Sequence, residues 1–519
     1  MNVFDFFPHQ NFRQFQKETI LEIKNHLESD SIENVILESP TGSGKSAIAI
    51  SLGLYFKSTF LLTSQKILQD QYIKDYSSDT VRVLKGRNNY PCLLLPNFTC
   101  EDSYCFTRQC HIKQECLYEI AKNQALASKV ALMNYKYFLC IMNYANLFGY
   151  RKLLICDEAH SLDEECMSFV EFSFSSFYLS KLGITSKIPI YEKLEEYIDW
   201  LKMILTLIES MKENVKTKMK NKFLKIEVVS DLQKELESLI SQEEKIKVFL
   251  ESYNKVEWVF DIIVNEKLRS KTIIFKPLTV GYFVQKLIFK HAEKKFFMSA
   301  TILDKESFCK NLDINLEKTK FIQVPSTFSP DIRPIILTRS GNLGKKHIDS
   351  SLPKIAFDVG RILEYHDVDK GLIHCHTFRI ANYIKDNIDE KYKNRIILHD
   401  SSTRTSALNF FLQSKQPKVL LTPSMTEGID LKDDLARFVV IVKLPFMFLG
   451  DKQVKRRMEI DHTWYQWKTA LTLVQAAGRG VRHENDFCTI YIMDSQFPQF
   501  LKQNLKFFPN YFITAIKNK

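Results

Sequence analysis

Glycine is scarce in this sequence, which has 15 glycines among 519 residues, or about 3% where about 7% is usual. A chain this sparing with glycine keeps it where the backbone conformation requires it. Four glycines fall in two short stretches, Gly42 and Gly44 in SPTGSGKS and Gly478 and Gly480 in QAAGRGVR. The sequence therefore points to these two stretches as sites of unusual backbone.

The sequence also lacks long apolar stretches. No uninterrupted apolar run reaches the roughly 18 residues that a membrane-spanning helix needs. The first residues, MNVFDFFPHQ, lack a basic start followed by an apolar stretch, so we expect no secretory signal. No internal repeat or low-complexity tract stands out. We therefore expect an intracellular protein, in the cytoplasm or nucleoid or in the nucleus of a eukaryotic cell, with no membrane partner.

The overall composition is that of a globular protein with a basic balance. Hydrophobic residues make up 45% and charged residues 26%, which excludes disorder over most of the length. The length gives room for roughly three to five domains, each able to bury a core. The formal net charge of +11 permits a polyanionic partner, although a lysine-rich solvated surface alone gives the same balance.

Five of the eleven cysteines crowd into one stretch: Cys92, Cys100, Cys105, Cys110 and Cys116. Without a secretory signal, a disulfide framework is not expected, and a local cluster favours a metal site. The intervals from Cys105 to Cys110 to Cys116 are five and six residues, wider than the CxxC knuckle of structural zinc. Iron–sulfur ligation tolerates such spacing better. Zinc and a chance cluster of thiols stay open as alternatives.

Short apolar runs alternate with helical patterns through most of the chain. Buried strands are predicted at ENVILESP (33–40), STFLLTSQ (58–65), LLICDEAH (153–160), KGLIHCHT (370–377), KVLLTPS (418–424), FVVIVKLPF (438–446) and CTIYIMD (488–494). Such alternation predicts a parallel-sheet α/β architecture. Between about 173 and 285 the apolar residues instead follow a three-four spacing, which predicts a helical insertion. The pattern indicates two α/β lobes, the first interrupted twice.

A phosphate-binding loop is predicted at residues 39–46, which read SPTGSGKS. Gly44, Lys45 and Ser46 match the template G-x-x-x-x-G-K-S/T, while Ser39 replaces its first glycine. A predicted strand precedes the loop, and the helical pattern SAIAISLGLYF follows it. In that context the loop N–H groups point at phosphates, Lys45 neutralises them and the Ser46 hydroxyl ligates Mg²⁺.

An acidic pair follows the third predicted strand, in the tetrapeptide DEAH (157–160). Asp157 at a strand end can hold Mg²⁺, and Glu158 can orient and deprotonate an attacking water. A helix N-cap with acidic first-turn residues would give the same letters. Its place about 110 residues after a phosphate-binding loop favours the catalytic interpretation.

Five motifs in this order resemble superfamily 2 helicases of the XPD/DinG type: SPTGSGKS, DEAH, MSAT (298–301), TEGID (426–430) and QAAGRGVR (475–482). LKGRNNYPC (84–92) is similar to the segment that precedes that family's first cluster cysteine. The spacing of Cys105, Cys110 and Cys116 resembles that of DinG's last three ligands. The resemblance extends from about Phe12 to Asp494. It implies an α/β fold with two RecA-like lobes, the first interrupted by a small iron–sulfur domain and a helical arch.

The resemblance also implies domain boundaries and residue roles. The expected ranges are 1–85, 129–172 and 286–325 for the first lobe, 86–128 for the iron–sulfur domain, 173–285 for the arch and 326–519 for the second lobe. Catalysis is expected from Lys45, Asp157, Glu158, Gln475, Arg479 and Arg482. Nucleotide binding is expected from Arg13, Gln16, Thr41, Gly42, Ser43, Gly44, Lys45, Ser46, Gly428 and Asp430. Within these sets, Arg13 and Gln16 would contact adenine. Arg479 and Arg482 would disperse charge on the transferring phosphoryl group.

Metal ligation is expected, on the same resemblance, from Ser46 and Asp157 for Mg²⁺ and from Cys92, Cys105, Cys110 and Cys116 for a 4Fe-4S cluster. Cys100 is then a surplus thiol that could replace one of these ligands, Cys92 before the others. Ser299 and Thr301 would couple the nucleotide state to lobe movement. The expected cofactors are thus ATP, Mg²⁺ and the cluster.

The function implied is that of an ATP-dependent DNA helicase, 5′→3′ in polarity, working as a monomer on single-stranded and forked or tailed duplex DNA in repair or replication. Two alternatives stay open at this point. One is a DEAH-type helicase of RNA or RNA–DNA hybrids, which the cysteine cluster disfavours. The other is an ATP-switched DNA-binding protein with little unwinding, which the full set of hydrolytic residues disfavours.

Overall fold

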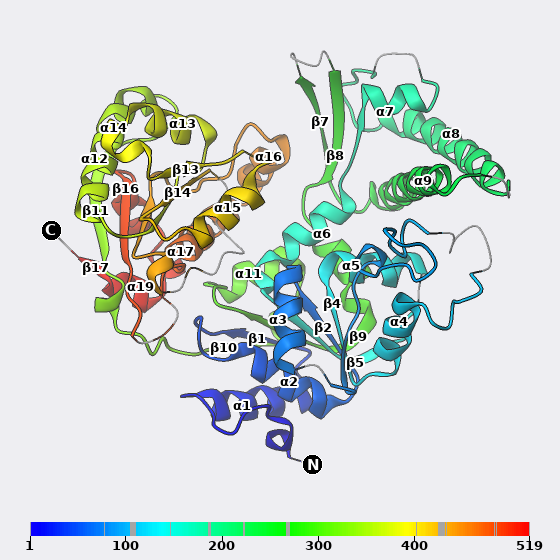
Figure 1. Ribbon diagram of the computed structural model, residues 1–519, viewed down its shortest axis with the longest axis horizontal. Coiled ribbons are helices and arrows are strands. Elements are labelled where there is room, and N and C mark those ends of the chain that lie inside the picture. The colour runs from blue at the N-terminus through cyan, green and yellow to red at the C-terminus, as the bar shows by residue number, and fades with distance from the viewer. Residues whose placement is uncertain are drawn as a thin grey trace.

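The computed structural model describes residues 2–76, 78–103, 110–145, 147–184, 188–221, 224–265, 270–400, 402–423, 431, 433–481, 483 and 485–517. Two lobes, each built on a parallel sheet, lie beside one another, and a further unit projects from the first lobe (Figure 1). Among the helices of these residues, none is both long and apolar enough to cross a membrane.

The first lobe contains a seven-stranded sheet whose paired strands all run parallel. In spatial order its strands are β10 (Thr319–Gln323), β1 (Asn34–Glu38), β9 (Ala292–Ser299), β5 (Arg151–Asp157), β2 (Thr59–Thr63), β4 (Val130–Asn134) and β3 (Val81–Val83). Parallel pairing places the carboxyl ends of the strands at one edge, where open α/β sheets bind ligands. The loops after β1, β5 and β9, which carry three of the motifs, therefore meet.

Helices cover this sheet and fix the loops at its edge. They are α1 (Gln16–Glu28), α2 (Lys45–Phe56), α3 (Lys66–Tyr76), α4 (Leu117–Ala127), α5 (Tyr135–Cys140), α6 (Leu162–Val170), α10 (Gly281–Leu287) and α11 (Lys305–Leu312). Helix α2 is buried from Ala47 to Gly53. Such an apolar helix is held by packing rather than by a single amphipathic face, so its N-terminus is held rigidly against the phosphate-binding loop.

The second lobe repeats the design with a second seven-stranded parallel sheet. Its strands, in spatial order, are β13 (Ile396–Leu398), β14 (Val419–Thr422), β12 (Gly371–His374), β15 (Phe438–Ile441), β16 (Thr489–Asp494), β11 (Ile335–Gly341) and β17 (Ile516–Lys517). Its helices are α12 (Ile348–Tyr365), α13 (Phe378–Asn387), α14 (Glu390–Lys393), α15 (Arg404–Gln413), α16 (Lys452–Ile460), α17 (His462–Ala477), α18 (Phe497–Gln503) and α19 (Asn510–Thr514). The prediction of two parallel-sheet α/β lobes is thus confirmed.

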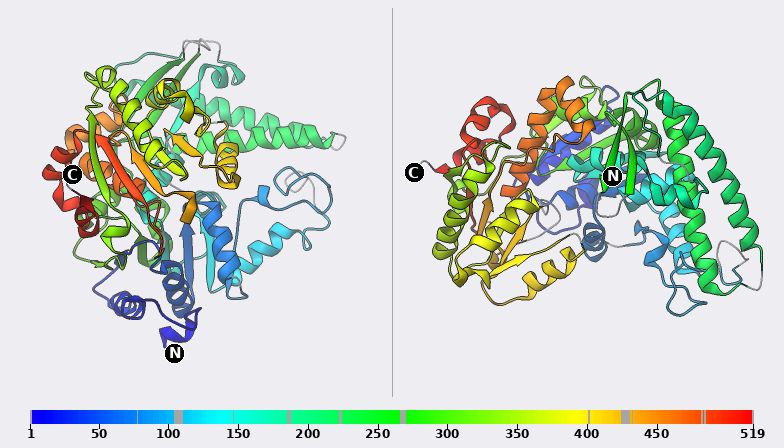
Figure 2. Two further views of the ribbon diagram at one scale, coloured as in Figure 1. Left: turned by 60° about the vertical axis from the view of Figure 1, so that its left-hand side comes forward. Right: turned by 90° about the horizontal axis from the view of Figure 1, so that it is seen from above.

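The insertion after the DEAH segment is mixed rather than wholly helical. Its helices are α7 (Ser176–Lys181), α8 (Glu196–Met219) and α9 (Ile226–Ser252), and the last two project together away from the lobes (Figure 2). An antiparallel sheet joins β6 (Phe172–Ser175), β8 (Ser270–Pro277) and β7 (Trp258–Asn265). Phe172 and Phe275 stack across it with ring centroids 4.9 Å apart. Aromatic pairing of this kind stabilises the sheet. The sequence does not predict this sheet, because the helical spacing of apolar residues in the neighbouring segments dominates the pattern.

The cysteine-rich segment lies between β3 and α4 and touches the insertion. A short antiparallel bridge joins Pro91 to Thr99, so the chain folds back on itself there. Beyond it, Ser230 on α9 donates to Asp102 Oδ1 over 3.2 Å, and Lys234 pairs with the same carboxylate at 3.2 Å. The two interruptions of the first lobe therefore contact one another (Figure 2).

Helix α17 of the second lobe is anchored in the first lobe by a buried ion pair. Lys468 Nζ lies 2.9 Å from Asp163 on α6 and 3.3 Å from Glu164. The side chains of Lys468 and Asp163 are only 6% and 7% exposed. The neighbouring Trp467 is fully buried and donates its indole N–H to the Ile302 carbonyl over 2.8 Å. These contacts fix α17 against the end of β9.

Replacing Lys468 with methionine should destabilise the protein by about 3–5 kcal/mol, because Asp163 would stay buried without its partner. The measurement is urea unfolding followed by tryptophan fluorescence, to which Trp467 contributes from the same helix. Lys202→Met is the control, since Lys202 and Asp199 form an exposed pair that contributes about 1 kcal/mol or less. Adding Asp163→Leu to Lys468→Met should restore much of the loss. An unchanged unfolding midpoint for Lys468→Met would contradict this account.

Candidate active site

A cleft of about 940 Å³ lies between the two lobes. Both lobes contribute residues to its walls, and eleven of the residues expected to act in catalysis or nucleotide binding are among them. These are Arg13, Gln16, Thr41, Gly42, Gly44, Lys45, Ser46, Asp157, Glu158, Gln475 and Arg479. Residues that lie far apart in the sequence thus meet at one place.

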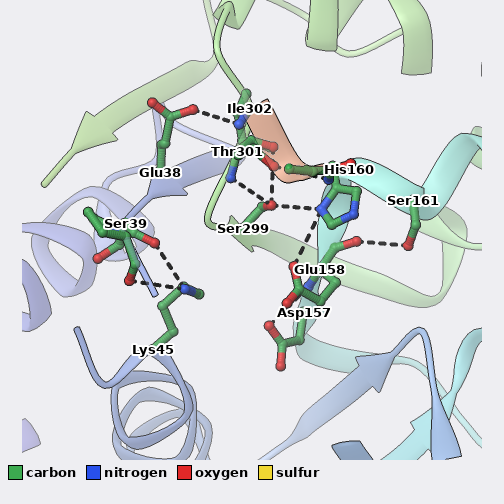
Figure 3. A network of polar contacts seen from close by, with 12 residues as sticks. Glu38, Ser39, Lys45, Asp157, Glu158, His160, Ser161, Ser299, Thr301 and Ile302 are labelled. Carbon is green, nitrogen blue, oxygen red and sulfur yellow. Dashed lines mark hydrogen bonds and ion pairs between the residues drawn. The ribbon is translucent and has the colours of Figure 1, made fainter. Parts of the chain in front are cut away.

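The phosphate-binding loop forms one wall of the cleft. Gly42 and Gly44 have φ values of 85° and 82°, a region that residues with a side chain rarely adopt. Lys45 begins α2, and its Nζ donates to the carbonyls of Ser39 and Pro40 over 2.9 and 3.3 Å (Figure 3). The lysine is therefore held over its own loop, at a helix N-terminus suited to an anion.

Arg13 and Gln16 line the cleft and bond to the backbone of this loop. Gln16 is 3% exposed and donates from Nε2 to the Gly44 carbonyl over 3.1 Å. Arg13 donates from Nη1 to the Gly42 carbonyl. Both side chains, which the resemblance associates with adenine, therefore bond to the loop backbone in this structure. A contact with the nucleotide base would use their remaining N–H groups.

The acidic pair stands opposite the loop lysine (Figure 3). Asp157 ends β5 and is 5% exposed, while Glu158 follows in the left-handed region at φ 51°. Burial, together with the charge of Glu158, raises the pKa of Asp157 to about 7 against the opposing charge of Lys45. A cation beside Asp157 would favour the ionised form that can act as a metal ligand.

Tyr72 on α3 is a site residue that the sequence motifs do not reveal. Its hydroxyl donates to Asp157 Oδ2 over 3.0 Å and also bonds to the side chain of Ser46. The two expected Mg²⁺ ligands are thus joined by one buried phenol, which is 2% exposed. Tyr72 belongs to no nucleotide motif, so only the fold brings it here.

A hydrogen-bonded chain runs from the acidic segment to the second lobe, and Figure 3 shows its first-lobe part, from His160 through Ser299 to Thr301. His160 Nδ1 lies 2.8 Å from Ser299 Oγ, and Ser299 Oγ donates to the Thr301 carbonyl over 3.1 Å. Gln475 on α17 then donates from Nε2 to Thr301 Oγ1 over 3.1 Å. The segment 299–301 therefore links the DEAH tetrapeptide to the helix that precedes Arg479.

Of the remaining second-lobe residues expected in the site, one lines the cleft and three lie outside the described residues. Arg479 lines the cleft close to His374, where burial together with the Arg479 charge lowers the pKa of His374 to about 3. Arg482, Gly428 and Asp430 lie outside the described residues. Arg333 and Tyr511 also line the cleft, with the guanidinium 4.4 Å from the ring centroid. No motif signals this pair, because its members are about 180 residues apart in the sequence.

Four of the five clustered cysteines surround one small cavity. They are Cys92, Cys100, Cys110 and Cys116, and Leu93, Ser103 and Ile112 complete its lining. The sulfurs of Cys100 and Cys116 lie 3.8 Å apart, and Cys100 is 3% exposed. Cys105 lies outside the described residues. The fold-back at Pro91 and Thr99 brings Cys100 beside the three thiols that the sequence had selected.

Two family models match the chain. One, described as a helicase C-terminal domain, matches residues 361–513, within the second lobe. The other, described as the res subunit of type III restriction enzymes, matches residues 9–203, which include the phosphate-binding loop and the acidic pair.

Curated relatives match most of the chain at low identity. The ATP-dependent DNA helicase YoaA of Haemophilus influenzae is 21% identical over 89% of this chain and 88% of its own. The ATP-dependent DNA helicase XPD of Sulfolobus acidocaldarius is 24% identical over 91% and 94%. A solved XPD helicase structure covers 96% of this chain and 98% of its own, with a TM-score of 0.66 and 18% identity. This last likeness is one of fold.

Gly44→Ala tests the fit between the loop and Gln16. An added Cβ would lie 2.4 Å from Gln16 Nε2, on a backbone held at φ 82°. We expect ATP affinity to fall about tenfold or more, since the left-handed conformation alone costs roughly 1–2 kcal/mol with a side chain. Gly149→Ala is the control, because nothing lies within 4 Å of the added atom there. Equal ATP affinity of Gly44→Ala and wild type in equilibrium titration would refute the loop assignment.

Proposed function

We propose that the chain is a superfamily 2 helicase of the XPD/DinG type, which hydrolyses ATP to move along single-stranded DNA and unwind duplexes. The observation that carries this proposal is the cleft between the lobes. It brings Lys45, Asp157 and Glu158 of the first lobe face to face with Gln475 and Arg479 of the second. A site divided between two lobes can respond to ATP by closing, and closure is what converts hydrolysis into movement.

In this proposal each side chain has a distinct task. Lys45 neutralises the β- and γ-phosphates, and Ser46 and Asp157 ligate Mg²⁺. Glu158 orients and deprotonates the attacking water. Arg479 enters from the second lobe and disperses charge on the transferring phosphoryl group, a task that Arg482 shares. Ser43 supports the loop through a hydroxyl contact of 2.7 Å with Ser39.

The DNA substrate follows from the curated relatives, whose names are those of DNA helicases. We infer 5′→3′ movement by a monomer on single strands, and on forked or tailed duplexes, in repair or replication. Such a substrate places the protein in the cytoplasm or nucleoid, or in the nucleus of a eukaryotic cell. The basic balance of +11 suits a polyanionic partner.

Lys45→Ala should lower ATP turnover by about a hundredfold or more, because a direct countercharge to the phosphates is lost. Wild-type turnover should rise on adding single-stranded DNA, and a duplex with a 5′ tail should be unwound. Lys354→Ala is the control, since Lys354 is exposed on α12 and pairs with Asp358. If RNA but not DNA raised the ATP turnover of the wild type, the RNA alternative would replace the DNA proposal. Unchanged ATP turnover of Lys45→Ala would contradict the assignment of residues 39–46 as the phosphate-binding loop.

We also propose that the cysteine cavity holds a 4Fe-4S cluster. The donor set fits, since soft thiolates select iron–sulfur groups or zinc. The intervals of five and six residues between Cys105, Cys110 and Cys116 are wider than the CxxC knuckle of zinc sites. Iron–sulfur ligation tolerates such intervals better, which favours the cluster over zinc.

The resemblance selects Cys105, Cys110 and Cys116 by their spacing and Cys92 as the fourth ligand by the segment that precedes it. Cys100 is the rival of Cys92, and both thiols line the cavity with Cys110 and Cys116. When bound, the cluster cross-links a segment with little regular structure of its own. The chain's part is to bring the thiols together through the fold-back at Pro91 and Thr99 and through α4, which begins at Leu117 directly after Cys116.

Cys110→Ser should remove iron, sulfide and visible absorption from anaerobically purified protein and stop unwinding. ATP binding should persist, because the phosphate-binding loop lies on a different part of the lobe. Cys100→Ser and Cys92→Ser form the matched pair, and we expect only Cys92→Ser to lose iron. The reverse result would assign Cys100 as the fourth ligand. Stoichiometric zinc without sulfide in the wild type would refute the cluster.

A further inference from the structure

Glu38 is a buried carboxylate at the end of β1, directly before the phosphate-binding loop. It is 8% exposed and is not among the residues that line the cleft. In the sheet it pairs with Ser299 of β9 on one side and with Gln323 of β10 on the other. A buried charge in such a place is costly unless hydrogen bonds satisfy it.

Three N–H donors satisfy this carboxylate. Its Oε2 accepts from the backbone N–H groups of Ile302 and Leu303 over 2.6 and 2.5 Å, and its Oε1 accepts from Gln323 Nε2 over 3.0 Å. Leu303 has a φ of 68°, in the left-handed region. Successive N–H groups around a left-handed residue form an anion-binding concavity. Glu38 therefore holds the turn at 301–303 in a conformation that Leu303 alone would disfavour.

The second lobe contacts the same turn from its other side. Trp467 donates its indole N–H to the Ile302 carbonyl over 2.8 Å, and Gln475 donates to Thr301 Oγ1 over 3.1 Å. These donors lie about two turns apart on α17, whose end carries the loop with Arg479. A shift of the turn would therefore move or release both contacts.

The turn is tied to the acidic segment as well. Ser299 Oγ accepts from Thr301 N over 3.1 Å and lies 2.8 Å from His160 Nδ1 (Figure 3). Glu38 lies on the opposite side of this turn in the same view, away from the acidic pair. The hydrogen bonds of the carboxylate thus reach the cleft through the 299–303 segment. Its charge also lies near Tyr511 of the cleft wall, where burial together with Glu38 raises the pKa of the phenol.

We propose that Glu38 is a positioning residue that fixes the turn at 301–303, so that α17 of the second lobe docks in register with the acidic segment. The proposal rests on the function proposed above. It assigns Glu38 a task distinct from nucleotide binding. Loss of its acceptor oxygens should uncouple α17, and with it Arg479, from the nucleotide while leaving the phosphate-binding loop able to hold ATP.

Glu38→Met and Glu38→Gln test this with side chains of similar length. Methionine cannot accept a hydrogen bond, whereas the glutamine oxygen still can. We expect Glu38→Met to lower kcat, with and without DNA, by about tenfold or more while the Kd for ATP stays within about threefold. Glu38→Gln should keep kcat within about threefold of wild type. Circular dichroism and thermal unfolding confirm that each variant is folded at the assay temperature.

Trp467→Phe supplies the second arm, because it removes the indole donor on the other side of the turn. If both residues act through Ile302, the double variant Glu38→Met/Trp467→Phe should have a kcat no lower than the worse single variant. Multiplying effects would show that the two residues act separately and would overturn the proposal. So would a Glu38→Met variant with wild-type kcat, or one whose ATP affinity falls in step with kcat.

The outcomes separate this inference from the proposed function. If nucleic acid left the ATP turnover of the wild type unchanged, the proposed function would be contradicted. The basal kcat of Glu38→Met relative to wild type would still test the role of Glu38. A wild type stimulated by DNA, with Glu38→Met behaving like wild type, would defeat only the role of Glu38.

Discussion

The buried pair of Lys468 and Asp163 is the contact on which the geometry between the lobes depends. It holds α17, an element of the second lobe, inside the first lobe, where its lysine is as buried as a core residue. Because a buried charge cannot leave its partner at low cost, the helix has a fixed axial position. Trp467, Gln475 and Arg479 take their positions from that register. The geometry of the cleft therefore depends on α17, whose Lys468 pairs with Asp163 of the first lobe.

The first-lobe side of the cleft obeys a different constraint, which is convergence of parallel strands. The ends of β1, β5 and β9 must lie at one edge, and so β9 pairs with Glu38 through Ser299 and with Asp157 through Met298, although these residues are far apart in the sequence. Burial at this edge raises the pKa of Asp157, and the nearby Lys45 opposes that rise. The same convergence places Asp157 where its carboxylate can ligate a metal ion and where burial makes its negative charge costly. A bound cation would lower that cost.

Much of this arrangement could be predicted from local patterns, and the exceptions share one physical reason. Apolar runs such as LLICDEAH predict buried strands because burial on both faces removes alternation. Motif spacing likewise selects Lys45 and Asp157. Lys468 could not be selected, since a lysine in a helix is ordinarily solvent-exposed and only the fold supplies Asp163. Tyr72 and Arg333 were hidden for the same reason, because their partners come from distant segments.

The cysteine cluster shows where spacing alone stops being informative. Spacing along the chain measures contour length, whereas ligation depends on where the chain turns back. The bridge between Pro91 and Thr99 shortens the path between Cys92 and Cys100, so a thiol that spacing leaves aside enters the cavity. The β7–β8 hairpin within the insertion is a parallel case, since long helices on either side dominate the periodicity. In both places a non-local pairing decides the structure, and local sequence patterns do not encode it.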